Sequence, residues 1–331
     1  MKKKNKAIYL LFLMPFVYFA TACFVVWLVK TSGIYPSGSD TMYHVYRGDY
    51  VYNAIKSGNW YPLYDPAWYN GVEILRYWSP FPAYVMAFCQ YLAGGSQFGA
   101  YLFYIGGVCF LGACVWPFIG RGFNRPYLGA FIGLLWFFMP NNLCAIFIEG
   151  NLARSLSMIF LPVFIYSVYK YLYNYKLRYI PLMVFTFLLM ELCHLGYAGM
   201  VAIAVIIYGI VYIIQKGRKK AALDVVISMI FGFMLLGIWL VASLRGGITS
   251  LDNSENMANF FQNLWITINP FERLTRGFEY FYFGFATLVV IVFGILFGYK
   301  KSRTGFVTGF IILLMTCLLY TSPSPRDISG S

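Results

Sequence analysis

The sequence predicts an all-α polytopic membrane protein, and three observations carry that prediction. Hydrophobic residues make up 60% of the 331-residue chain and charged residues only 11%, whereas a soluble domain carries about 25% charged residues. The apolar residues gather in runs of roughly 17–25, which is the length of an α-helix that crosses a bilayer. Lys and Arg concentrate in alternate connections between these runs, the pattern that orients membrane helices.

The apolar runs predict about nine transmembrane helices. We expect these helices near residues 7–29, 98–119, 127–147, 153–173, 180–198, 199–215, 223–244, 278–298 and 305–316. The first run follows the basic segment MKKKNK and is too long for the core of a signal peptide, so we interpret it as an uncleaved helix. A shorter run at 80–94 begins beside Pro80 and Pro82. We expect that run to lie at the membrane interface or to re-enter it.

The distribution of charge predicts the orientation of these helices. With the N-terminus in the cytoplasm, the inner segments hold 16 basic residues and one acid, Asp224, while the outer segments hold eight basic and nine acidic residues. The net charge of +13 therefore reflects topology, and we expect no nucleic-acid partner. Two outer segments are long, 30–79 and 245–277, so we expect the functional groups to act on the extracytoplasmic side.

The end of the chain differs in character from the rest. Residues 317–327 read CLLYTSPSPRD, which resembles the translation of a sequencing adapter; the alternative is a polar Ser/Pro tail after a helix. We therefore expect one transmembrane domain over residues 1–316, truncated at its C-terminus, and a non-native tail over residues 317–331.

The first outer segment opens with a cluster of charged groups in SGSDTMYHVYRGDY, residues 37–50. Asp40, His44 and Arg47 are spaced i, i+4, i+7, so they would share one face of a helix. Asp40 could accept a proton or bind a divalent metal such as Mg²⁺ or Mn²⁺, and Arg47 could bind a phosphate through two hydrogen bonds. Asp49 follows as a candidate for substrate binding. Alternatively, Asp40 only caps the helix N-terminus.

An aromatic stretch follows over residues 55–84, broken by Gly and Pro. It predicts a cleft for a carbohydrate or a lipid headgroup, because aromatic faces stack on sugar rings, with Trp60, Tyr64, Trp68 and Arg76 as the candidate binding residues. An aromatic belt at the membrane interface explains the same composition.

Two further segments carry ionisable groups beside apolar runs. EGNLARSL places Glu149 and Arg154 at the start of a predicted helix, and ELCHLGYAG places Glu191 and His194 near the outer end of another. Ionisable groups in such positions are candidates for function. Helix capping by Asn151 and an interhelical hydrogen bond from His194 are the structural alternatives. The chain has only two His, which excludes a multi-His metal site.

The ordered set of motifs SDTMYHVYR, IKSGNWYPLYDPAWYNG, YWSPFPAY, EGNLARSLSMIFLPVFIY and LCHLGYA resembles a known family. It is similar to the bacterial membrane proteins labelled 6-pyruvoyl-tetrahydropterin synthase-related, close to the YfhO-like group, which in turn look like GT-C-fold glycosyltransferases. The resemblance covers residues 1 to about 300. The synthase in the label is a soluble enzyme with clustered His ligands, which this chain lacks, so we do not expect that activity.

The resemblance implies a GT-C-like helical bundle in the bacterial cytoplasmic membrane. The implied reaction transfers a sugar from a polyprenyl-phosphate donor to a glycan, lipid or protein acceptor on the outer face. The implied catalytic residues are Asp40, His44 and Glu149, and the implied binding residues include Arg47, Arg154 and His194. The chain has Ser39-Asp40 where a DxD or Asp-Glu pair would bind a metal. A transporter or flippase of lipid-linked glycans and a non-catalytic envelope assembly protein remain the alternatives.

Overall fold

The computed structural model describes residues 2–36, 38–68, 71–76, 78–245, 296, 303–305 and 307–309. Within these residues the regular structure is helical, apart from one isolated β-bridge between Asp65 and Val72. The chain divides into two compact units, residues 1–198 with 227–248 and residues 199–226 with 249–331. The outer segment 245–277, the spans 278–298 and 305–316 and the tail 317–331 lie wholly or mostly outside the described residues.

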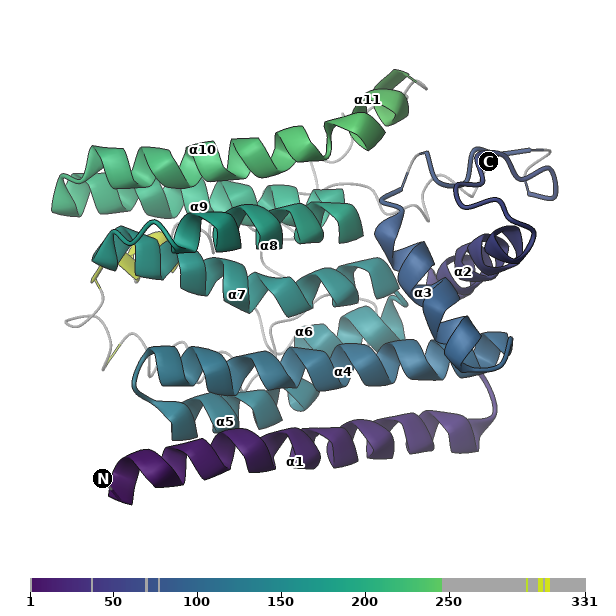
Figure 1. Ribbon diagram of the computed structural model, residues 1–331, viewed down its shortest axis with the longest axis horizontal. Helices are drawn as coiled ribbons and strands as arrows, with labels where there is room; N and C mark the ends of the chain where they lie inside the picture. The colour runs from purple at the N-terminus through teal and green to yellow at the C-terminus, as the bar shows by residue number, and fades with distance from the viewer. Residues whose placement is uncertain are drawn as a thin grey trace, which may run out of the picture. The chain divides into compact units, whose positions relative to one another are not determined.

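The first unit is built on long helices that lie beside one another (Figure 1). Helix α4 (Gln97–Gly122) packs against α1 (Lys2–Ser32), α5 (Pro126–Leu135) and α7 (Leu152–Asn174), and α7 packs in turn against α8 (Tyr179–Cys193). Small residues allow the close approach: an added β-carbon on Gly120 would lie 2.6 Å from the α-carbon of Gly129. The buried Tyr18 hydroxyl donates to the Ala130 carbonyl at 2.8 Å and joins α1 to α5.

The predicted outer segment forms a smaller layer at one end of α4 (Figure 1). Helix α2 (Thr41–Lys56) packs against α3 (Phe81–Leu92), and α3 contacts α4. The connection between them folds back on itself through the Asp65–Val72 bridge. Its apolar residues bury against these two helices in a cluster of Val51, Ile74, Leu75, Ala83 and Ala87. The 12-residue α3 is too short to span a bilayer, as the sequence predicted for residues 80–94.

The described helices make the chain a multi-pass membrane protein. Four segments are long and apolar enough to cross a bilayer, Phe12–Ser32, Gln97–Gly122, Leu152–Asn174 and Leu195–Lys216. A fifth span is formed if α10 (Lys219–Leu235) and α11 (Gly237–Arg245), bent by 64° at their junction, count as one. The described residues therefore give four or five candidate spans and do not confirm the predicted nine.

The predicted span 127–147 is not a single helix. Helix α5 ends at Leu135 and is followed by a 3₁₀ turn, η1 (Trp136–Phe138), a short α6 (Pro140–Leu143) and a π-helical turn, η2 (Cys144–Ile148). Pro140 causes the break, because proline disfavours the helical conformation of the residue before it. Met139 accordingly adopts extended dihedral angles, φ −64° and ψ 122°.

The boundary between the predicted helices 180–198 and 199–215 also lies elsewhere. The apolar pattern placed it between residues 198 and 199, but α8 ends at Cys193 and α9 (Leu195–Lys216) begins two residues later. His194 breaks the helix with extended dihedral angles, φ −155° and ψ 96°. The break therefore places His194 in a bend rather than inside a helix.

The second unit contains most of α9, the start of α10 and the described residues 303–305 and 307–309. Gly217 has a φ of +70° and ends α9, a conformation that glycine adopts without strain. The β-carbon position of Gly209 lies 3.8 Å from the Ala222 side chain. These contacts describe a helical hairpin with a basic turn, one of the connections predicted to face the cytoplasm.

Candidate functional site

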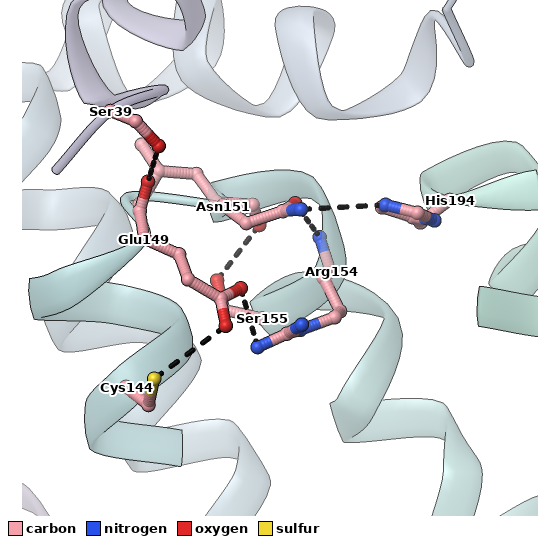
Figure 2. Close-up of polar contacts among 8 residues, drawn as sticks. Ser39, Cys144, Glu149, Asn151, Arg154, Ser155 and His194 are labelled. Atoms are coloured by element: carbon pink, nitrogen blue, oxygen red, sulfur yellow. Dashed lines mark hydrogen bonds and ion pairs between the residues drawn. The ribbon is translucent and has the colours of Figure 1, made fainter. Parts of the chain in front are cut away.

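The start of the outer segment lies directly against the turn that precedes α7 (Figure 2). The Asp40 backbone N–H donates to the Glu149 carbonyl at 3.0 Å, and the Ser39 hydroxyl donates to the same oxygen at 3.1 Å. Gly150 has a φ of +67°, and an added β-carbon there would lie 2.6 Å from the Thr41 nitrogen. Only glycine fits this contact. The motifs GSDT and EGN, far apart in sequence, thus form one structure.

A buried ion pair stands at the centre of this turn. Glu149 Oε2 lies 2.6 Å from Arg154 Nη2, and the two side chains are only 15% and 14% exposed. The Cys144 thiol, from the π-helical turn, donates to Glu149 Oε1 at 3.5 Å. Burial raises the pKa of the Glu149 carboxyl, the nearby Asp40 raises it further, and Arg154 opposes both effects. A carboxyl with such a raised pKa is suited to exchanging a proton.

The first turn of α7 brings this ion pair close to His194 (Figure 2). Asn151 caps the helix, because its Oδ1 accepts a hydrogen bond from the Arg154 backbone N–H at 2.9 Å. Asn151 Nδ2 lies 3.5 Å from His194 Nε2. On the other side of the ring, His194 Nδ1 accepts a hydrogen bond from the Tyr197 backbone N–H at 3.0 Å. Burial, followed by the charge of Arg154, lowers the pKa of His194 to about 4, so the imidazole is neutral at pH 7.

Helix α2 contributes a second buried pair, His44 and Arg47. Arg47 is 1% exposed; its Nη2 donates to the Trp78 carbonyl at 3.2 Å and its guanidinium lies 5.3 Å from the centre of the Tyr43 ring. Within the described residues its Nε has no hydrogen-bond partner. Burial lowers the pKa of His44 to about 3, and the charges of Arg47 and His194 lower it as well.

His44 and Arg47 both lie among the buried residues of α2, as their spacing predicted, while Asp40 lies just before the first turn of the helix. Asp40 occupies the N-cap position of α2, but its side chain makes no capping hydrogen bond to the described first turn. The Asp40 side chain therefore does not cap the helix, which was the structural alternative that the sequence offered. The backbone of Asp40 instead holds the segment against Glu149.

The other predicted binding residues lie away from this site. Asp49 Oδ1 accepts a hydrogen bond from Gln90 Nε2 at 2.6 Å and so ties α2 to α3. Arg76 pairs with Glu73, and its Nε donates to the Ala242 carbonyl at 3.0 Å. Their predicted roles in substrate binding stay predictions.

The aromatic candidates divide by exposure. The Trp68 ring packs against the rings of Tyr43 and Tyr46, each at 4.8 Å. Trp60 is 71% exposed and Tyr64 57% exposed. Both exposed rings lie in the 57–80 connection, and their role in binding a sugar stays a prediction.

Comparison with known proteins identifies the family. A family model described as the 6-pyruvoyl-tetrahydropterin synthase related domain, a membrane protein, matches residues 75–323. The chain belongs to this family. No curated protein and no solved structure matches it.

The matched region contains Glu149, Arg154 and His194 but begins after α2. It confirms the 6-pyruvoyl-tetrahydropterin synthase-related part of the resemblance. The YfhO-like and GT-C parts stay predictions.

The site also contains residues that the sequence did not single out for it. Asn151 was predicted only as a possible cap, and Ser39 and Cys144 were not predicted to contact Glu149. The asparagine before a helix start is a local signal, but its second contact, to His194, depends on the tertiary fold. Nothing in the local sequence around Cys144 indicates a thiol facing Glu149.

The carboxylates do not form a good site for a divalent metal. Across the part of the chain that the structure describes, no group of three or more His, Cys, Asp and Glu side chains could hold a metal ion. Asp40 is near Glu149, but Arg154 already neutralises that carboxylate at 2.6 Å, and a guanidinium repels a cation at the same oxygen. The donor set therefore does not fit Mg²⁺ or Mn²⁺ well.

Proposed function

We propose that this chain is the membrane part of a glycosyltransferase. It transfers a sugar from a polyprenyl-phosphate donor to a glycan, lipid or protein acceptor at the outer face of the bacterial cytoplasmic membrane. The observation that supports this proposal most is the joining of the Asp40 segment to Glu149, because it brings Asp40 close enough to act electrostatically on a carboxylate that pairs with Arg154. Carboxylates can take up and release a proton, and a guanidinium can bind a phosphate.

The chemistry follows from the different surroundings of the two acids. Asp40 is partly exposed and acts as the base that takes the proton of an acceptor hydroxyl. The acceptor oxygen then bonds to the anomeric carbon of the sugar, as the bond between that carbon and the phosphate oxygen breaks. The polyprenyl phosphate leaves with an additional negative charge, which Arg154 stabilises.

Glu149 and His44 serve this reaction without carrying the first proton transfer. The ion pair with Glu149 orients Arg154, and the raised pKa of Glu149 allows it to receive a proton from Asp40. His44 is neutral and lies close to the buried Arg47. Because it carries no charge of its own, it does not offset the positive charge that Arg47 offers to the phosphate. The exposed Trp60 and Tyr64 rings provide a surface for the sugar.

Ligand binding by the protein in detergent tests this proposal. Thermal melting is recorded with a panel of polyprenyl-phosphate sugars for the wild type and for the Asp40→Asn and Asp224→Asn variants. A ligand at 100 times its dissociation constant stabilises the folded protein by about 2.7 kcal/mol. We expect a sugar-selective rise in melting temperature for the wild type and for Asp224→Asn, which changes a carboxylate in a predicted cytoplasmic connection. A flat response across the whole panel would contradict the proposal.

One observation favours a second function, a flippase for lipid-linked glycans. The 64° bend between α10 and α11 and the breaks around Pro140 are interruptions of the kind that transporters place beside a substrate path. A flippase would move a fluorescent lipid-linked glycan across a proteoliposome bilayer and leave its covalent structure unchanged. Movement without transfer, retained in Asp40→Asn, would favour this function over the enzyme.

A further inference from the structure

Two hydrogen-bond donors face one another at the start of α7, and this arrangement is unfavourable as it stands (Figure 2). Asn151 Nδ2 and His194 Nε2 lie 3.5 Å apart. A hydrogen bond needs a donor and an acceptor. The protonation of the two nitrogens therefore decides whether they bond to each other or converge on a third group.

The other hydrogen bonds of both side chains decide this protonation. His194 Nδ1 accepts from the Tyr197 backbone N–H at 3.0 Å, so Nδ1 carries no proton and Nε2 carries the proton of the neutral ring. Asn151 Oδ1 accepts from the Arg154 backbone N–H at 2.9 Å, so the other terminal atom of Asn151 is the NH₂ group. Rotating the amide would place the NH₂ group against a backbone N–H at 2.9 Å. Both groups at the 3.5 Å contact are thus donors.

A guanidinium group lies close to this donor pair. Arg154 is three residues after Asn151 and lies close enough to His194 to act on it electrostatically. His44 is close enough to feel both His194 and Arg47 in the same way. The N-terminus of α7, where the backbone N–H groups point outward, adds to this field.

Arg47 gives an independent indication of a ligand. Its side chain is 1% exposed, its Nε lacks a hydrogen-bond partner and it forms no ion pair within the described residues. A buried guanidinium without a carboxylate is costly unless an anion comes to it. Glu149 does not supply that charge, because its carboxylate pairs with Arg154.

We propose that Asn151 and His194 form a two-donor clamp for a phosphate oxygen, with Arg154 and Arg47 supplying the positive field. In this arrangement the oxygen lies between Asn151 Nδ2 and His194 Nε2 and accepts a hydrogen bond from each. The clamp rests on the proposed function for the assignment of the phosphate to a polyprenyl lipid. The binding of phosphate itself follows from the donor pair.

The variant Asn151→Asp tests the clamp because it separates binding from folding. An aspartate caps a helix as well as an asparagine does, and its second oxygen accepts a hydrogen bond from His194 Nε2. The fold thus gains a bond where the wild type has two facing donors, while the phosphate loses a donor and meets a negative charge. We expect the melting temperature to stay or rise and phosphate affinity to fall by about 10- to 100-fold.

The matched control is Asn53→Asp, which makes the same change in charge at an exposed position of α2. Both variants and the wild type are titrated by calorimetry in nanodiscs with two probes, inorganic phosphate and undecaprenyl monophosphate. Weakening of both probes by Asn151→Asp alone supports recognition of the phosphate itself. Binding of the lipid probe only, weakened in the same variant, supports the clamp with a lipid headgroup as its source. Equal affinity of wild type and Asn151→Asp, or no binding of either probe to the wild type, overturns the proposal.

A spectroscopic measurement on the wild type keeps the proposal testable if Asn151→Asp does not fold. With ¹⁵N-labelled histidine, we expect His194 to show a protonated Nε2 whose resonance shifts on addition of phosphate. An Nδ1-protonated ring, or a resonance that phosphate does not move, would overturn the clamp. Sugar transfer is measured in parallel: a clamp that binds phosphate without any transfer contradicts only the proposed function, and transfer with unchanged affinity in Asn151→Asp contradicts only the clamp.

Discussion

The turn before α7 and the 57–80 connection were both predicted as binding regions, yet their polar groups behave differently. In the connection, Asp65 receives hydrogen bonds from the Tyr46 hydroxyl at 2.5 Å and the Ala67 backbone N–H at 2.9 Å. These bonds hold the connection to α2. In the turn before α7, Asn151 and His194 present two donors to each other. Polar residues that are satisfied within the fold stabilise it, and polar residues that are not satisfied are the better candidates for ligand binding.

Removing one partner of the buried ion pair has the largest expected effect on stability. Arg154→Met leaves Glu149 buried without its counter-charge, which costs about 3–5 kcal/mol. The double variant Arg154→Met with Glu149→Gln removes the unpaired charge and should regain most of that stability. Thermal melting of the single and double variants, compared with the wild type, measures this coupling.

The same pair of variants sharpens the distinction between the two regions. We expect the double variant to be folded and still unable to bind a polyprenyl phosphate, because Arg154 is absent. Binding at wild-type affinity by the double variant would mean that the turn before α7 only stabilises the fold.

The pH dependence of stability tests the burial of His44. The pKa of His44 in the folded chain is about 3, below the ordinary 6.5, so the unfolded chain binds the additional proton between these values. Stability from this residue is therefore complete above pH 6.5 and is lost as the pH falls toward 3. Between pH 6.5 and 4.5 we expect a loss of about 2–3 kcal/mol.

The variant His44→Gln provides the comparison for this measurement, because it cannot take up the proton. The melting temperatures of the two proteins are recorded over the same pH range. Parallel pH profiles of the wild type and His44→Gln would show that His44 is accessible to protons in the folded protein.

A smaller effect is expected where the two motifs meet. Gly150→Ala places a β-carbon against Thr41 in a backbone conformation with φ +67°, and we expect a loss of about 1–3 kcal/mol. Gly58→Ala is the control, since Gly58 also has a positive φ of +87° but has open space around its β-carbon position. Denaturation of both variants separates the cost of the backbone conformation from the cost of the contact. Equal losses would mean that the Gly150 contact with Thr41 does not matter.

The smallest expected effect concerns the connection. Tyr46→Phe removes the 2.5 Å hydrogen bond from the exposed Tyr46 side chain to the buried Asp65, and should lower stability by about 0.5–1.5 kcal/mol. We expect phosphate affinity to be unchanged when binding is measured well below the melting temperature. A variant that loses phosphate affinity as strongly as Asn151→Asp would remove the distinction between the two regions.

The sequence predicted the long helices well, because hydropathy summed over a window detects them. Helices α1, α4 and α7 lie close to their predicted bounds. The same sum does not detect a backbone break, so it missed the interruption at Pro140 and the bend at His194. Proline could have indicated the first break, whereas nothing at residue 194 itself marks the second.

The site was harder to predict for a related reason. Asp40 was chosen for its helical spacing with His44 and Arg47, and Glu149 and Arg154 were chosen as ionisable groups beside an apolar run. The structure brings the segments that carry them together. The contact between Gly38 and Gly150 that allows this is long-range, and no periodicity in the sequence encodes it. The orientation of Asn151 toward His194 depends on the same tertiary contact and on the bend after α8.

In the proposed reaction, the carboxylates at this site transfer a proton as a sugar leaves its lipid phosphate. Mass spectrometry of the products formed by the protein in nanodiscs tests this reaction most directly, with the donor that raises the melting temperature most and a panel of envelope acceptors. We expect the wild type to form a glycosylated acceptor and free polyprenyl phosphate, and Asp40→Asn to be slower by about 10²- to 10⁴-fold at unchanged stability. Transfer by Asp40→Asn at the wild-type rate would contradict the claim.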